Sequence, residues 1–167
     1  MTAAKGAGRP PDSRARTSRT RDRPGKAIGT RGLDLRGDRR LALVVASGFA
    51  GVVAFQLSRI AGAPWGAAAY GGANHGRLPS ELRVASVVLG SFWLLAGLTA
   101  LSRGGLASPI PYGLSRRAMW ALTALLAVGS VMNAASSSPW ERYGWAPITL
   151  GLAVLSLQLA RSGRHPH

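Results

Sequence analysis

The chain has 167 residues, of which 47% are hydrophobic and only 16% are charged, yet its formal net charge is +15. A soluble domain usually carries about a quarter charged residues, so this composition argues against an ordinary water-soluble or nucleic-acid-binding domain. Residues 1–40 contain twelve Lys or Arg and four Asp, whereas residues 41–167 contain nine Arg and two Glu between long uncharged stretches. The pattern indicates an integral membrane protein with a basic N-terminal tail, and nucleic acid is not an expected partner.

Two features of the composition restrict the source and the chemistry. The chain has 19 Arg but only 2 Lys, together with 22 Gly, which is typical of a GC-rich coding sequence, so we expect a bacterial protein. It has no cysteine. Disulfides, thiol catalysis and thiolate metal sites are therefore excluded.

Residues 1–40 form the basic tail. They hold few hydrophobic residues and no aromatic residue, and Pro10, Pro11 and Pro24 interrupt any regular helix. Such a segment cannot bury enough apolar surface to offset the entropy of ordering its backbone. We therefore predict that residues 1–40 are disordered.

Four uncharged segments follow the tail, at residues 41–58, 84–102, 118–135 and 144–160. A helix needs about 20 predominantly apolar residues to cross a bilayer, and lipid forces the backbone to satisfy its own hydrogen bonds. The sequence thus predicts an all-α membrane protein with four transmembrane helices in a compact bundle over residues 41–161. Residues 162–167 are predicted to be a short cytoplasmic tail.

The uncharged stretch at residues 60–76 differs from the four spans. It contains Pro64, five glycines, Asn74 and His75, a composition that disfavours a membrane helix. We expect a loop that lies against the lipid interface. A short re-entrant or amphipathic segment is the alternative, because Trp65 and Tyr70 lie within it.

The distribution of basic residues predicts the orientation. With the N-terminal tail inside, 17 Lys or Arg lie on the cytoplasmic side and four lie outside, so both termini are expected in the cytoplasm of a bacterial inner membrane. Cleavage of the first span as an export signal is disfavoured, because Pro64 would follow the cleavage site and three more spans come after it. The arginines nearest the inner surface are expected to contact anionic lipid headgroups: Arg36, Arg39, Arg40, Arg116 and Arg117.

Each span also carries small or weakly polar residues at helical spacing, which allow helices to pack closely in lipid. This spacing predicts the packing faces of the four helices. They are Ser47, Gly51, Ala54 and Ser58 in the first span; Ser86, Gly90, Trp93, Gly97 and Ala100 in the second; Thr123, Ser130, Asn133 and Ser137 in the third; and Thr149 and Ser156 in the fourth.

Larger polar and aromatic residues in or near the spans are candidate contacts with a ligand or with another helix. Amide side chains in membranes serve most often as hydrogen bonds between helices, and less often as ligand contacts. Arg59 follows Gln56 by one helical turn and is expected to extend to the outer headgroups. The candidate contacts are Gln56, Trp65, Tyr70, Trp93, Asn133, Trp145 and Gln158.

Residues suited to catalysis are scarce. The middle of each predicted span lacks charged residues and histidine, and no glycine pattern of a phosphate-binding loop occurs. The sequence predicts no enzymatic activity, no catalytic residues, no cofactor and no metal site. The one remaining arrangement for chemistry would bring Glu81, His75 and Glu141 together at the outer face.

Two short motifs carry a resemblance to a known family. Ala63-Pro64-Trp65-Gly66 with Tyr70-Gly71-Gly72 follows the first span, and Trp140-Glu141-Arg142 leads to Trp145-Ala146-Pro147-Ile148 at the fourth. Over residues 41–160 the chain resembles an uncharacterised family of small four-span bacterial membrane proteins. The resemblance implies four spans and no assigned activity. Within it, the aromatic and glycine segments would be the working surface, because loops on rigid scaffolds commonly carry function.

Two hypotheses for the function remain open at this stage. The first is a non-enzymatic inner-membrane protein whose bundle binds a lipid, a hydrophobic ligand or a partner helix. The second is a component of a small oligomeric transporter, because four helices leave little room for a conduit. The lipid bilayer is the expected partner in both cases, with a homo-oligomer or another membrane protein as a further one.

Overall fold

The computed structural model describes residues 25–162, and it describes side-chain surroundings from residue 36 onward. Four α-helices follow one another along the chain: α1 (Gly25–Ile60), α2 (Ser80–Arg103), α3 (Tyr112–Ala134) and α4 (Ala146–Arg161). Two 3₁₀ turns, η1 (Gly66–Ala68) and η2 (Tyr70–Gly72), lie between α1 and α2, and a π-helical segment, η3 (Trp140–Trp145), leads into α4. The predicted all-α architecture is confirmed.

Four helical segments are long and apolar enough to cross a membrane. They are Arg36–Ile60, Ser80–Arg103, Tyr112–Ala134 and Trp140–Arg161, with 25, 24, 23 and 22 residues. At about 1.5 Å per residue each is longer than the roughly 30 Å of hydrocarbon in a bilayer. The four predicted spans are therefore confirmed, and the segment at residues 61–79 contains only short turns between α1 and α2.

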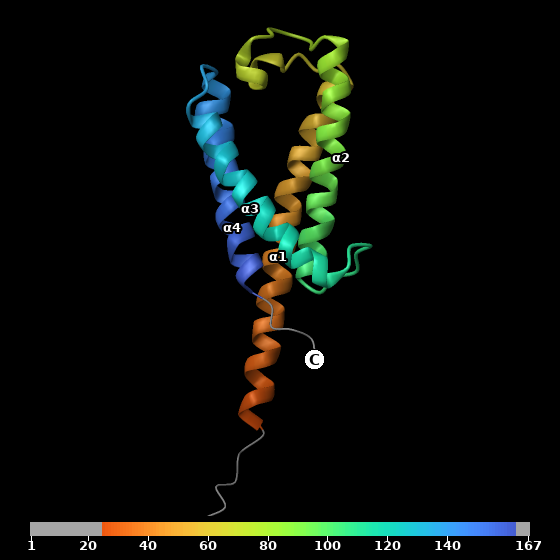
Figure 1. The fold of residues 1–167 in the computed structure, drawn as a ribbon, viewed down its shortest axis with the longest axis vertical. Coiled ribbons are helices and arrows are strands. Elements are labelled where there is room, and N and C mark those ends of the chain that lie inside the picture. The colour runs from red at the N-terminus through yellow and green to blue at the C-terminus, as the bar shows by residue number, and fades with distance from the viewer. Residues whose placement is uncertain (1–24, 163–167) are drawn as a thin grey trace, which may run out of the picture.

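The first helix is longer than the sequence indicated. It begins at Gly25, directly after Pro24, whereas disorder was expected up to residue 40. Residues 36–40 belong to the first span, because the apolar part of the span provides a formed helix onto which a further turn can be added at little cost. In Figure 1 this part of α1 projects beyond the bundle. The predictions for residues 1–24 and 163–167 lie outside the described residues.

The bundle consists of two helical hairpins. Figure 1 shows α1 beside α2 and α3 beside α4, and the two pairs lie close together at one end and diverge toward the other. We call the end with the connections at residues 61–79 and 135–145 the loop end. The opposite end, with the connection at residues 104–111, is called the tail end.

The apolar core lies in the tail half of the bundle, where all four helices contribute. It contains Phe49 of α1 and Met119 of α3, both without exposed surface. The loop half, where the hairpins diverge, is joined by other contacts, described below. The core residues are Ala42, Val45, Phe49, Ala96, Ala100, Met119, Leu122, Leu126, Leu152, Ala153, Leu159 and Ala160.

The small residues of α2 form its packing face, as predicted, but those of α1 do not. Ser86, Gly90 and Ala100 are buried, whereas Gly51 is exposed, and a Cβ added there would meet no atom within 4 Å. The prediction for the first span is therefore wrong. Its outward positions are Ser47, Gly51 and Ala54.

The small residues of α1 face outward because α1 packs its large side chains against the small residues of α2. Phe49 packs where α2 has Gly97, so that a Cβ built on that glycine would lie 3.7 Å from the Phe49 Cβ. Phe49 also stacks on Trp93, with ring centroids 5.6 Å apart. One small-residue face suffices for close approach when its partner supplies the large side chains.

Large apolar side chains cover the outside of all four spans. Between 22% and 33% of the residues in the most apolar part of each span are buried within the chain. Val88, Val131 and Leu95 each expose more than half of their surface. An exposed apolar surface this extensive is unstable in water and stable in lipid, in agreement with a multi-pass membrane protein.

Candidate functional site

At the loop end, the connection at residues 61–79 is joined to the connection between α3 and α4. Ser138 donates its hydroxyl to the carbonyl of Ala67 at 2.7 Å, and Ser137 donates to the carbonyl of Gly71 at 3.0 Å. The indole Nε1–H of Trp145 donates to the carbonyl of Ala68 at 3.0 Å. These bonds link the two hairpins where the apolar core does not reach. We call this group of contacts the loop-end latch.

Glu141 lies at the centre of the loop-end latch. Its side chain, in the π-helical segment η3, is 9% exposed. One carboxylate oxygen accepts the Gly71 N–H at 3.0 Å, and the other accepts the Ser136 hydroxyl. Hydrogen bonds to a carboxylate are stronger than those between neutral groups, so Glu141 holds the turn at Gly71 firmly.

Three aromatic rings pack beneath these polar contacts. Phe55 of α1 lies between two tryptophans, with its ring centroid 6.0 Å from that of Trp65 and 4.7 Å from that of Trp145. Aromatic pairs at such distances add about 0.5–1.5 kcal/mol beyond the area that they bury. The cluster joins α1 to the start of α4 and completes the loop-end latch.

Arg59, in the last turn of α1, is buried beside this cluster. Only 2% of its surface is exposed, so the expectation that it extends to the headgroups is wrong. Nη1 donates to Gln56 Oε1 at 3.1 Å, and the guanidinium carbon lies 4.7 Å from the ring centroid of Tyr70 and 5.2 Å from that of Phe55. The side chain cannot reach outward because the 61–79 connection folds back over it.

Tyr70 holds its ring against Arg59 from a strained backbone. Its φ of 52° is the only positive value at a non-glycine residue among residues 25–162. A bulky residue rarely adopts this left-handed conformation, so surrounding contacts must maintain it. Two such contacts are present: the ring of Tyr70 packs against Arg59, and the next residue, Gly71, donates its N–H to Glu141.

A separate feature, an apolar groove of about 420 Å³, lies between α2 and α3 in the tail half. Leu122 lies at its buried side, while Leu95 and Leu125 are about half exposed. Its one polar side chain, Thr99, donates its hydroxyl to the carbonyl of Leu95 at 2.8 Å, so the groove offers little hydrogen-bonding capacity. The residues that line it are Phe92, Leu95, Ala96, Thr99, Ala118, Ala121, Leu122 and Leu125.

The structure divides the predicted contact residues into two sets. Gln56, Trp65, Tyr70 and Trp145 meet at the loop end, around Phe55 and Arg59. The other three lie apart from this set.

Of these three, Trp93 stacks on Phe49 between α1 and α2. Asn133 donates to Thr149 Oγ1 at 3.5 Å, between α3 and α4. Gln158 is exposed in the last turns of α4, away from the core.

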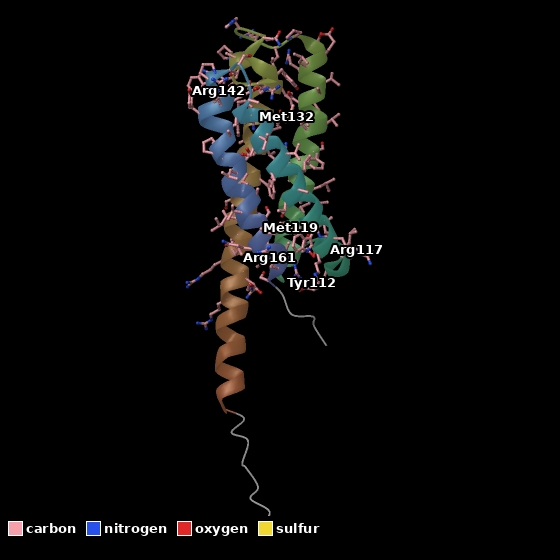
Figure 2. The ribbon with its side chains drawn as sticks, turned by 60° about the vertical axis from the view of Figure 1, so that its left-hand side comes forward. Tyr112, Arg117, Met119, Met132, Arg142 and Arg161 are labelled. Atoms are coloured by element: carbon pink, nitrogen blue, oxygen red, sulfur yellow. The ribbon has the colours of Figure 1, made fainter. Side chains whose placement is uncertain are left out.

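The arginines predicted to contact anionic lipid are exposed and belong to the tail end. Figure 2 shows Arg117 and Arg161 at this end, and Arg142 at the loop end. The exposed arginines at the tail end are Arg36, Arg39, Arg40, Arg116, Arg117 and Arg161.

A further arginine at the tail end, Arg103, is buried and stabilises the end of α4. It donates to the carbonyl of Leu159 at 3.3 Å and also to those of Ala160 and Ser162. Its guanidinium lies against the ring of Tyr112. Arg103 therefore caps the last carbonyls of a helix, where a positive charge is favourable.

The grouping of Glu81, His75 and Glu141 that could have supported chemistry is not observed. Glu81 and His75 are exposed while Glu141 is buried, and no three acidic, histidine or cysteine side chains in the described part of the chain are grouped to hold a metal ion. Sequence reasoning missed the burial of Glu141, Arg59 and Arg103. The one available signal was that acidic residues are scarce after residue 40, which singled out Glu81 and Glu141 but gave no indication for the two arginines.

No protein-family model, curated protein or solved structure matches the chain.

Proposed function

We propose that the protein is a non-enzymatic integral membrane protein that binds an acyl chain, or a ligand of similar lipophilic character, in the groove between α2 and α3. The observation that carries this proposal is the groove itself. The groove has a volume of about 420 Å³ and is open on the outer side of the bundle, where Leu95 and Leu125 are about half exposed, so a chain from the surrounding lipid can lie in it. Its lining is apolar apart from Thr99, whose hydroxyl is already used, so it favours hydrocarbon over polar ligands.

The location proposed is a bacterial inner membrane, with the tail end in the cytoplasm. Among residues 36–162, seven arginines lie at the tail end and four at the loop end. Cytoplasmic ends of membrane proteins carry an excess of Lys and Arg. The exposed tail-end arginines would then face anionic lipid headgroups, at about 1 kcal/mol for each near-surface charge.

Occupancy of the groove can be tested with Ala121→Phe. Ala121 is exposed and lines the groove, so a benzyl group there fills the space. We expect the purified protein in detergent to crosslink a photoactivatable fatty acid, and Ala121→Phe to reduce the yield about ten-fold. Ala127→Phe, at an exposed position of the same helix outside the groove, is the matched control and should retain wild-type yield. Equal labelling of both variants would exclude the groove as the site.

A further inference from the structure

Arg59 is a buried cation whose donors are only partly satisfied by the chain. Nη1 is bonded to Gln56, but Nε and Nη2, both inaccessible to solvent, have no acceptor among the described residues. An arginine side chain stays protonated in proteins. A buried charge with unpaired donors is costly, so its burial calls for a complementary partner.

The two unpaired donors lie on the same edge of the guanidinium group. Nε–H and one N–H of Nη2 point side by side, in the geometry that pairs with two oxygens of a phosphate or carboxylate group. The rings of Tyr70 and Phe55 contact the guanidinium through their faces. They fix its orientation and leave the hydrogen-bonding edge unpaired.

The buried carboxylate at this end is already engaged. Both oxygens of Glu141 accept hydrogen bonds, one from Gly71 and one from Ser136. Other positive charges surround the end of α1: Arg83 donates its Nε to the carbonyl of Ile60 at 3.0 Å, and the Arg77 side chain lies beside Gly62. The surroundings of Arg59 therefore favour an anion from outside the chain.

We propose that Arg59 forms, with Gln56, Phe55 and Tyr70, a binding site for a phosphate group at the loop end of α1. The side-on edge of the guanidinium takes two phosphate oxygens. Tryptophan and tyrosine side chains at the loop end are exposed, among them Trp65, Trp140 and Tyr143, and such rings mark the depth of lipid headgroups. The phosphate group belongs either to a phospholipid headgroup or to a soluble phosphate.

Access to the site requires the Tyr70 segment to move, because the unpaired nitrogens have no accessible surface. Tyr70 has the positive φ described above, and the two glycines after it also have positive φ. The site is separate from the α2–α3 groove in the tail half. The failure of either proposal therefore leaves the other unaffected.

The test uses the full chain in a maltoside detergent, which contains no phosphate. Two probes are titrated separately, inorganic phosphate and phosphatidylglycerol, with bound molecules counted by native mass spectrometry. We expect saturable binding of at least one probe by the wild type. Binding of phosphatidylglycerol alone identifies a lipid headgroup as the ligand, and binding of inorganic phosphate alone identifies a soluble phosphate. If both probes bind, the probe with the lower Kd identifies the ligand.

Variants then assign the binding to Arg59. Arg59→Lys keeps the charge but loses the two-donor edge, and Arg59→Met loses both, so each should bind the preferred probe at least ten-fold more weakly. Arg142→Gln, which removes an exposed arginine at the same end, should bind like the wild type. Should Arg59→Met fold poorly, Arg59→Lys alone decides. The proposal is overturned if the wild type binds neither probe, or if Arg59→Lys binds as tightly as the wild type.

Discussion

Three charged residues decide how the ends of the bundle are built, and all three are buried. Arg103 satisfies the carbonyls at the end of α4, and Glu141 satisfies donors of two separate connections. Arg59 is held by one amide and two ring faces. The sequence placed each of them at a span boundary, where arginines usually meet water or headgroups. The burial of Arg103 and Glu141 could not be predicted, because each has a hydrogen-bond partner far away along the chain, at 56 residues for Arg103 and Leu159 and at 70 residues for Glu141 and Gly71.

Glu141→Ala should loosen the loop-end latch. It leaves the Gly71 N–H and the Ser136 hydroxyl without their acceptor, and hydrogen bonds to charged groups contribute about 1.5–3 kcal/mol each. We expect a lower unfolding temperature and faster amide hydrogen exchange over residues 61–79. The unfolding temperature and exchange rate of Glu141→Gln should lie between those of the wild type and of Glu141→Ala, because an amide oxygen can still accept the Gly71 N–H.

Glu81→Ala is the control for this experiment, since Glu81 is an exposed carboxylate at the same end. It should leave hydrogen exchange over residues 61–79 unchanged and lower the unfolding temperature less than Glu141→Ala does, because Glu81 contributes only as a charge in the first turn of α2. Unaltered exchange over residues 61–79 in Glu141→Ala would show that Glu141 does not hold this connection.

At the scale of elements, the span lengths were predictable, whereas the packing face was predictable for α2 but not for α1. Bilayer thickness sets the length of a hydrophobic helix. Three of the predicted segments lie within the observed ones, and the other, 118–135, ends one residue beyond Ala134. The face that each helix buries depends on its partner, as Phe49 against Gly97 shows. The resemblance to a family of four-span proteins remains a prediction, although the two segments that carry it do meet, through Gly71 and Glu141.

Gly104→Ala should separate α1 from α2 at the tail end. A Cβ at position 104 would lie 2.3 Å from the Cβ of Ala42, which cannot rotate away. Overpacking of this kind costs about 1–3 kcal/mol. We expect a lower midpoint in thermal unfolding of the detergent-solubilised protein.

Gly51→Ala provides the comparison, because a Cβ there meets no atom within 4 Å. It should be neutral, or stabilising by up to about 1 kcal/mol through helix propensity. A loss of stability in Gly51→Ala together with none in Gly104→Ala would reverse the assigned packing faces of this hairpin.

At the scale of the whole molecule, the apolar core packs the four helices together in the tail half, and the loop-end latch joins the two hairpins in the loop half. Among residues 36–162, seven arginines lie at the tail end and four at the loop end. Each crossing of the membrane reverses the side on which the chain emerges. Four crossings therefore place the connections at residues 61–79 and 135–145 on one side and the 104–111 connection on the other.

The most direct test of this account is site-specific labelling of single cysteines, which is clean because the chain has none of its own. His75→Cys, Ala107→Cys and Tyr143→Cys place a thiol at an exposed position in each of the three connections. In intact bacterial cells, a membrane-impermeant maleimide should label positions 75 and 143 and should label position 107 only after the membrane is permeabilised. Labelling of position 107 together with position 75 in intact cells would contradict the four-span topology.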